Sequence, residues 1–284
     1  MNASEVIAHI NLQLGSSYKF VGRYAHGESH VASQVIDDAS NRYVLKIGAG
    51  HEFRPEHAAH VTQLLRSRGY PAPEYVAVGI MAQTSYSLQR VMPGEPIELR
   101  VRPALLPQLL HLNDLQCGQG ESENDEPDRL IRGVMEGYPD FCIIDTVRSY
   151  SAESAALLDA LQRIVTARAS ECPQRNDIVH FDFHINNILI EGDRITGVID
   201  WEGSESGDCA FDLATLLFYI WPFTDFRDAL WRELLERTTR GAAAVYLAHM
   251  IVRQLDWSMR HHDRGTVDNY MRISSDILRD ISQL

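Results

Sequence analysis

The sequence has few cysteines and no long apolar run, and each shortage excludes a class of protein. Its four cysteines lie far apart and form no C-x-x-C pair, which argues against a structural zinc site and a disulfide framework and favours a reducing compartment. The longest apolar candidate, Leu213 to Ile220, is far too short to span a bilayer. Met1 to Gly15 has no basic region before an apolar core, so we expect no signal peptide and a cytoplasmic location.

Basic residues are also in short supply. Lysine and arginine total 26 against 39 aspartates and glutamates, a net charge of −13, which argues against nucleic acid or an anionic membrane surface as a partner. The charge favours cationic ligands, although solubility alone also explains an acidic composition. With 284 residues, 45% of them hydrophobic, the chain is long enough for one large domain or two fused lobes.

One segment, Ile178 to Ala214, places polar residues around a predicted β-hairpin. Two apolar runs, Ile188 to Ile190 and Ile195 to Ile199, flank a Gly-Asp turn, which is typical of two antiparallel strands. The polar residues at the outer ends of these runs are His180, Asp182, His184, Asn187 and Asp200. Because a hairpin brings its outer ends together, we expect two carboxylates and an amide oxygen to converge there. Such an all-oxygen set suits magnesium rather than zinc.

The order of these residues, H-x-D-x-x-x-x-N followed by an apolar run and I-D-W, resembles the catalytic and metal-binding segment of the aminoglycoside phosphotransferase family, relatives of the protein kinases. The resemblance implies that Asp182 is the base facing a substrate hydroxyl and that Asn187 and Asp200 hold magnesium. Gly207-Asp208 with Asp212 matches the family's G-D-x-x-x-D-L-A tail. The family commonly has glycine after the first histidine and Pro-Gly before the asparagine. The residues found at these positions are Phe181, Ile185 and Asn186.

The N-terminal third predicts a short helix, five strands and a second helix. The strands are expected at Tyr18 to Tyr24, Val31 to Ile36, Tyr43 to Ile47, Tyr75 to Ile80 and Tyr86 to Met92. The second helix is expected from Pro55 to Arg68, where apolar residues recur on one face. The fold class is therefore α+β. By the resemblance it is a two-lobed, protein-kinase-like fold, with a five-stranded antiparallel sheet and a helix in residues 1–93 and a mainly helical lobe in residues 94–284.

Lys46 is a cation within a β-branched strand. Burying it is costly unless a carboxylate or a phosphate lies beside it, whereas a lysine on an edge strand can simply face solvent. The resemblance implies that Lys46 contacts the nucleotide phosphates and pairs with Glu56 on the following helix, with Glu52 as the competing glutamate.

Two turns of the N-terminal lobe gain a nucleotide role from the same resemblance. Gly27 and Ser29 lie where the family has its nucleotide-covering loop, and an ordinary hairpin turn explains them nearly as well. The carbonyl of Arg90 and the amide of Met92 would meet the purine base, just before the strand is stopped by Pro93-Gly94.

The C-terminal lobe is expected to be mainly helical. Helices are predicted at Val101 to Leu115, Ala152 to Ala169, Leu213 to Ile220, Phe226 to Arg237, Ala242 to Met259 and Asn269 to Ile281. Gly118 to Asp128 is dense in negative charge, which is typical of a solvated loop, and the alternative is a flap that attracts a polycationic substrate. By resemblance, Glu202, Glu205 and Asp256 are candidates for recognising a cationic substrate.

The resemblance implies an O-phosphotransferase that uses ATP and Mg²⁺, with GTP not distinguished from ATP, and that acts as a monomer or a dimer on a small molecule. A cationic antibiotic fits best, either an aminoglycoside or a basic cyclic peptide such as viomycin or capreomycin. Kinases of macrolides, choline or homoserine are alternatives, and an inactive nucleotide-binding module is the alternative of a different class. A zinc hydrolase built on His180, Asp182 and His184 leaves Lys46 unexplained. A serine hydrolase fails because Glu205 occupies the centre of the G-x-S-x-G pattern.

Overall fold

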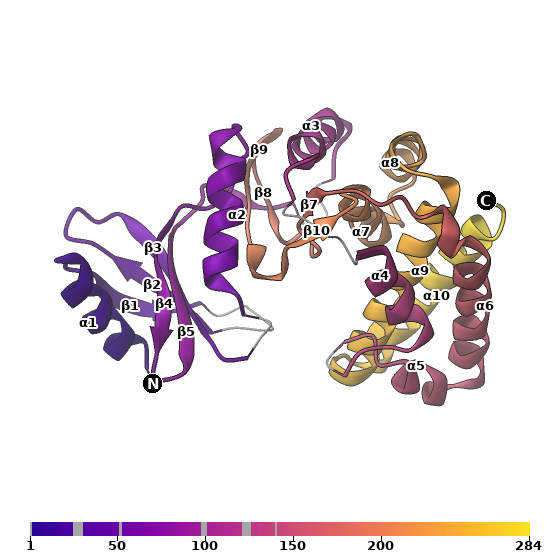
Figure 1. Ribbon diagram of the computed structural model, residues 1–284, viewed down its shortest axis with the longest axis horizontal. Helices are drawn as coiled ribbons and strands as arrows, with labels where there is room; N and C mark the ends of the chain where they lie inside the picture. The colour runs from indigo at the N-terminus through magenta and orange to yellow at the C-terminus, as the bar shows by residue number, and fades with distance from the viewer. Residues whose placement is uncertain (1, 25–30, 51–52, 98–100, 121–125, 140) are drawn as a thin grey trace. The chain divides into compact units, whose positions relative to one another are not determined.

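Figure 1 shows the computed structural model, which describes residues 2–24, 31–50, 53–97, 101–120, 126–139 and 141–284. The chain forms two compact units. The first consists of Met1–Ile97 with Asn186–Ser204, and the second of Glu98–Ile185 with Glu205–Leu284. The predicted hairpin strands, Ile188 to Ile190 and Ile195 to Ile199, thus belong to the same unit as the N-terminal sheet. Asp182 belongs to the second unit. A domain boundary after residue 93 stays a prediction.

An antiparallel sheet forms the centre of the first unit. Its five strands are β1 (Lys19–Arg23), β2 (Val31–Ile36), β3 (Arg42–Gly48), β4 (Tyr75–Met81) and β5 (Thr84–Arg90), in the spatial order β1-β2-β3-β5-β4. These strands and their antiparallel pairing confirm the predicted fold class. Because successive side chains of a strand point to opposite faces, Lys46 lies on the face opposite to its buried neighbour Leu45.

Two helices, α1 (Ala3–Leu14) and α2 (Pro55–Ser67), lie on opposite faces of this sheet (Figure 1). The Asn2 side chain accepts a hydrogen bond from the Glu5 amide, and the Glu5 carboxylate accepts one from the Asn2 amide, which forms a capping box at the start of α1. The buried residues of α1 pack against the sheet core around Leu45 and Leu88. α2 begins with Pro55, whose fixed φ suits a first helical turn.

A hairpin completes the first unit. It consists of β8 (Ile188–Glu191) and β9 (Arg194–Val198), with the short strand β6 (Glu95–Pro96) paired to β8 and the 3₁₀ turn η3 (Trp201–Gly203) after β9. Gly94 has a φ of 98°, and a Cβ there would lie 2.8 Å from the carbonyl oxygen of Ile190. The Thr196 hydroxyl donates to the carbonyl of Pro93 at 2.6 Å. The chain at Pro93-Gly94 therefore packs closely against the hairpin, and only glycine fits at position 94 because a Cβ would collide with the hairpin backbone.

The second unit is mainly helical, as predicted. Its elements are η1 (Pro103–Leu105), α3 (Leu106–Gln116), α4 (Glu126–Met135), α5 (Ile144–Tyr150), α6 (Ala152–Arg168), η2 (Ala169–Glu171), β7 (Asp177–Val179), β10 (Glu205–Gly207), α7 (Ala210–Ile220), α8 (Thr224–Arg237), α9 (Arg240–His261) and α10 (Arg264–Ile281). Helices α4 and α5 were not predicted. α4 takes up the end of the acidic stretch 118–128, of which residues 121–125 lie outside the described part of the chain.

Helix α9 forms the centre of the second unit, and α4, α5, α6, α7, α8 and α10 all contact it. Every residue from Gly241 to Val252 is buried, as expected for a helix surrounded on all sides. His249, Arg253 and Asp256 are the acidic and basic residues between Gly241 and Trp257 of this helix. In the described part of the chain, no helix is both long and apolar enough to cross a membrane.

Candidate functional site

Lys46 is the centre of a buried charge cluster in the first unit. Its Nζ donates to Oδ1 of Asp200 at 2.8 Å and to Oε2 of Glu202 at 2.9 Å. The Lys46 side chain is only 13% exposed, and that of Glu202 only 4%. The expectation that this strand lysine needs a carboxylate beside it is thus met by two residues from the end of the hairpin segment.

Burial and charge act in opposite directions on the ionisation of this cluster. Burial alone would lower the pKa of Lys46, but Asp200 and Glu202 outweigh it and hold the pKa well above its ordinary value. Burial raises the pKa of Glu202, and the neighbouring Asp200 raises it further while Lys46 opposes both. The cluster therefore keeps Lys46 charged and makes Glu202 sensitive to the loss of its cation.

Asn187 and Asp200 stand at neighbouring ends of the hairpin. The Ile199 amide donates to the Asn187 carbonyl at 2.9 Å, which fixes the chain before β8 against the chain after β9. Asp200 has a φ of 73°, in the left-handed region that aspartate tolerates better than most residues. Its side chain is 47% exposed, whereas Asn187 is buried. A carboxylate and an amide oxygen at one edge form a donor set that fits a hard cation such as Mg²⁺.

Asp182 lies in the second unit, beside Arg253 and His184. Arg253 from α9 donates to its Oδ1 at 2.9 Å, and Nε2 of His184 lies 3.4 Å from its Oδ2. Burial would raise the pKa of Asp182, but Arg253 and His184 outweigh it and hold the pKa well below the ordinary range. Asp182 is therefore ionised across the physiological pH range.

Asp212 anchors the loop that leads to Asp182. Its carboxylate accepts hydrogen bonds from the amides of His180 at 2.8 Å and Phe181 at 3.0 Å, and from the Gln116 side chain at 2.6 Å. Burial raises the pKa of Asp212 to about 7, against the opposing effect of these donors. In turn, Nδ1 of the buried His180 accepts the Asp182 amide at 3.2 Å. The backbone amides of His180, Phe181 and Asp182 are thus all hydrogen-bonded to buried side chains.

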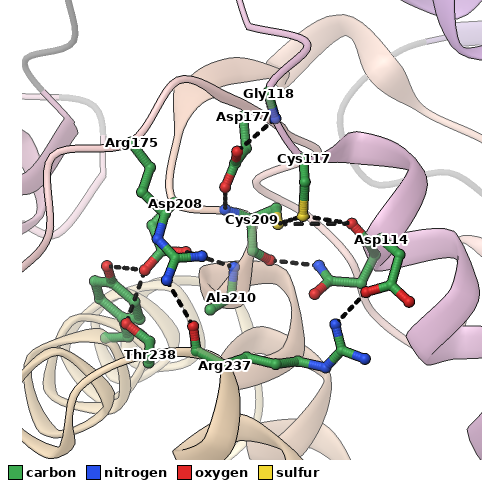
Figure 2. Close-up of polar contacts among 12 residues, drawn as sticks. Asp114, Cys117, Gly118, Arg175, Asp177, Asp208, Cys209, Ala210, Arg237 and Thr238 are labelled. Carbon is green, nitrogen blue, oxygen red and sulfur yellow. Dashed lines mark hydrogen bonds and ion pairs between the residues drawn. The ribbon is translucent and has the colours of Figure 1, made fainter.

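Asp208, the other aspartate of the G-D-x-x-x-D-L-A segment, has a different set of partners. Its carboxylate accepts a hydrogen bond from the Thr238 hydroxyl at 2.8 Å (Figure 2). It accepts another from the Tyr246 hydroxyl at 2.9 Å. Burial raises its pKa, and the Thr238 hydrogen bond and Arg175 oppose that rise. Asp208 therefore ties the start of α7 to α8 and α9, whereas Asp212 supports the loop at Asp182.

The structure corrects the predicted partner of Lys46 in the nucleotide half of the site. Glu56 occupies an exposed position on α2, and the carboxylates beside Lys46 are those of Asp200 and Glu202. Gly27, Ser29 and the competing Glu52 lie outside the described residues.

The two positions predicted to meet a purine base, Arg90 and Met92, lie among the residues that the structure describes. Arg90 ends β5, and its amide donates to the Glu74 carbonyl at 2.9 Å. The Met92 side chain packs on Gly197 of β9, where an added Cβ would meet it at 3.1 Å. Their contacts with a base stay predictions.

The three carboxylates predicted to recognise a cationic substrate already have cations of this chain as partners. Glu202 is buried against Lys46. Glu205 pairs with Arg129 at 2.6 Å, and Asp256 makes two hydrogen bonds to Arg260 at 2.8 and 2.9 Å. Paired in this way, they serve the internal charge balance.

Sequence reasoning missed Arg253 and Arg129. Both guanidinium groups lie over the Phe181 ring, at 5.6 and 4.8 Å from its centroid. Arg253 also donates to the Phe181 carbonyl at 2.6 Å. A cation inside the long apolar pattern of the predicted helix from residue 242 to 259 was the available signal, because a buried arginine requires an acceptor or an anion.

The chain matches the sequence profile of the phosphotransferase enzyme family over residues 21–246. A segment of 66 residues is 38% identical to the hygromycin-B 4-O-kinase of Escherichia coli, and it covers 23% of this chain and 19% of that kinase.

Solved structures of small-molecule kinases are similar to this chain in fold. A thermostable mutant of aminoglycoside phosphotransferase APH(4)-Ia, in a ternary complex with AMP-PNP and hygromycin B, is 20% identical with a TM-score of 0.74, covering 97% of this chain and 98% of that one. Amicoumacin kinase hAmiN is 12% identical with a TM-score of 0.63, covering 100% and 94%. Since the profile match extends over most of the sequence and includes Lys46, Asp182, Asn187 and Asp200, the chain belongs to the phosphotransferase enzyme family.

Proposed function

We propose that this protein transfers the γ-phosphate of ATP to a hydroxyl group of a cationic antibiotic, with hygromycin B as the first acceptor to test. The observation that carries the proposal is the buried Lys46, paired with Asp200 beside Asn187, in a chain that matches the phosphotransferase family from residue 21 to residue 246. A charged lysine next to a hard-cation donor set is suited to a nucleoside triphosphate.

Each requirement of phosphoryl transfer has a candidate residue in one of the two units. In the first unit, Lys46 would neutralise phosphate oxygens, and Asn187 and Asp200 would hold Mg²⁺, which supplies positive charge at the phosphates when bound. In the second unit, Asp182 would orient the acceptor hydroxyl and accept its proton. The Arg253 ion pair supports this role because it keeps the carboxylate ionised.

The choice of acceptor rests on two further observations. A segment of the chain is 38% identical to a hygromycin-B 4-O-kinase, and the net charge of −13 favours a cationic ligand. Glu202, Glu205 and Asp256 are not proposed as substrate contacts, because each is paired with a cation of this chain.

ATP consumption by the purified protein tests the acceptor. The panel contains hygromycin B, other aminoglycosides, viomycin, capreomycin, a macrolide, choline and homoserine. We expect hygromycin B or another cationic antibiotic to stimulate turnover. Stimulation by choline or homoserine alone refutes the antibiotic proposal. Nucleotide binding without turnover on any acceptor identifies an inactive nucleotide-binding module.

Exchange of the proposed base tests the mechanism. Asp182→Asn should lower turnover roughly 10²- to 10⁴-fold, the usual range for losing a positioned base, with nucleotide affinity little changed. Asp159→Asn is the matched control, because Asp159 also pairs with an arginine of the second unit, Arg148, at 2.8 Å, but on the surface. Near-normal turnover in Asp182→Asn, measured beside an unchanged control, overturns the assignment.

A further inference from the structure

Two cysteines of the second unit lie side by side (Figure 2). The Sγ atoms of Cys117, directly after α3, and Cys209, directly before α7, are 3.3 Å apart. Both sulfurs lie near the Asn113 carbonyl oxygen, at 3.4 and 3.6 Å. Cys209 is 2% exposed, whereas Cys117 is of intermediate exposure. Cys117 is thus partly exposed, whereas Cys209 is packed in the interior.

Asp177 holds the two cysteines together through the backbone. Its Oδ1 accepts the amide of Gly118, the residue after Cys117, at 2.7 Å, and its Oδ2 accepts the amide of Cys209 itself at 3.2 Å (Figure 2). The Asn113 side chain donates to the Cys209 carbonyl at 2.7 Å. Hydrogen bonds from both chain segments therefore fix the backbones that carry the two sulfurs.

We propose that Cys117 and Cys209 form a reversible disulfide when the protein meets a hydroperoxide. The sulfurs need to approach by about 1.3 Å, from 3.3 Å to the length of roughly 2.05 Å of a disulfide. These two thiols and Asp177 also place ligand atoms within 4.8 Å of one another. A tetrahedral zinc ion would instead push the sulfurs apart, to roughly 3.8 Å for bonds of about 2.3 Å, and both oxygens of Asp177 already accept amides. The geometry therefore favours the disulfide.

The two thiols differ in a way that assigns their roles. The hydrogen bond with Cys209 lowers the pKa of the Cys117 thiol, although burial opposes this, and the same contact together with burial raises the pKa of Cys209. With hydrogen peroxide, the Cys117 thiolate attacks one peroxide oxygen, so that an S–O bond forms, the O–O bond breaks, and the released hydroxide takes up a proton to give water. Cys209 then attacks the sulfur of this sulfenic acid, and the hydroxyl leaves with the Cys209 proton as a second water. Two thiols are oxidised, and one peroxide is reduced.

Closing the disulfide would act on the loop at Asp182. Gln116, the last residue of α3, donates to Asp212 in the first turn of α7 at 2.6 Å, and Asp212 in turn holds the amides of His180 and Phe181. Drawing the end of α3 towards the start of α7 changes this anchor. We therefore expect the oxidised protein to lose phosphotransferase turnover. This consequence rests on the proposed function, whereas the disulfide itself does not.

Mass spectrometry of the full-length protein tests the chemistry without an activity assay. After treatment with hydrogen peroxide, we expect a cross-linked peptide pair containing Cys117 and Cys209, the loss of two hydrogen atoms, and full reversal by dithiothreitol. In Cys209→Ser, Cys117 should stop at the sulfenic acid, which dimedone traps. Cys172→Ser is the matched control, because Cys172 has the same intermediate exposure and its exchange should leave the cross-link intact.

Three outcomes overturn the proposal. In the first, both thiols of the peroxide-treated protein can still be alkylated after unfolding. In the second, Cys117 is oxidised to sulfinic acid and no cross-link forms. In the third, the purified protein contains stoichiometric zinc, and Cys117→Ser loses it. The effect on Asp212 has its own readout, which is ATP turnover of the oxidised protein before and after reduction. Unchanged turnover of fully cross-linked protein overturns the coupling, whereas absence of turnover in the reduced protein bears only on the proposed function.

Discussion

Replacing Lys46 with methionine tests how much the buried charge cluster contributes to stability. Methionine keeps an unbranched apolar stem, so the lost charge dominates the effect. Glu202, whose side chain is 4% exposed, would be left beside Asp200 without a cation. Removing one partner of a buried pair costs about 3 to 5 kcal/mol. Because water reaches the Asp200 side chain, which is 47% exposed, we expect the lower end of that range, about 3 kcal/mol at pH 7.

The cost should vary with pH in a defined direction. Burial and Asp200 hold the pKa of Glu202 above its ordinary value even with Lys46 present, and removing Lys46 raises it further. A carboxyl group with a raised pKa in the folded state favours folding when it is protonated, and this contribution is lost as pH rises through the folded pKa. The destabilisation by Lys46→Met should therefore be largest at pH 7 and shrink towards pH 5.

Urea denaturation of wild type and variant at pH 5 and pH 7 measures both effects. Lys19→Met is the matched control, because Lys19 pairs with Asp38 at the same 2.8 Å, but the two side chains are 65% and 61% exposed. An exposed pair contributes little, so the control should lose much less stability at either pH. Equal losses in the two variants, or a loss in Lys46→Met that does not change with pH, would refute the reasoning.

Three further predictions concern the second unit. The Arg253 guanidinium outweighs burial and lowers the pKa of Asp182, so Arg253→Met should move the acid limb of the turnover–pH profile to higher pH, and an unmoved limb contradicts this. Burial raises the pKa of Asp212 to about 7, so the free energy of unfolding should fall as pH rises towards 7, and Asp212→Asn should flatten that decline in denaturation curves. Burial lowers the pKa of His249 to about 3 from 6.5, so stability should be lost as pH falls below 6.5, and thermal melts of His249→Gln should show a smaller acid loss.

The regular elements of the first unit could be predicted because their signals are local. The strand Val31–Ile36 and the helix start at Pro55 agree with the structure, since a β-branched run and an N-terminal proline each act over a few residues. Helices α4 and α5 lacked comparable signals. α4 begins within a stretch dense in acidic residues, and α5 is only 7 residues long, too short for a clear apolar period.

The partner of Lys46 shows what local signals cannot supply. A cation in a buried strand requires an anion, so a nearby carboxylate was predictable from Lys46 alone. The family resemblance indicates Glu56 on the next helix, whereas the observed Glu202 follows 156 positions after Lys46 in the chain. The correct choice depends on how the end of the hairpin segment packs against the sheet, and no sequence period encodes that.

Phe181 shows how this chain accommodates a residue where the family commonly has glycine. Its φ of 72° lies in the left-handed region, which glycine adopts freely and a bulky residue adopts only under constraint. Asp212 accepts its amide and Arg253 donates to its carbonyl, and the Arg253 guanidinium also lies over its ring. The same guanidinium binds Asp182, so the ring that replaces glycine supports the cation that keeps the proposed base ionised. Phe181→Gly would relieve the strain of the positive φ and would also remove the ring over which the Arg253 guanidinium lies. We therefore infer that the position of Arg253 depends on Phe181, and the conformation of Phe181 on Arg253.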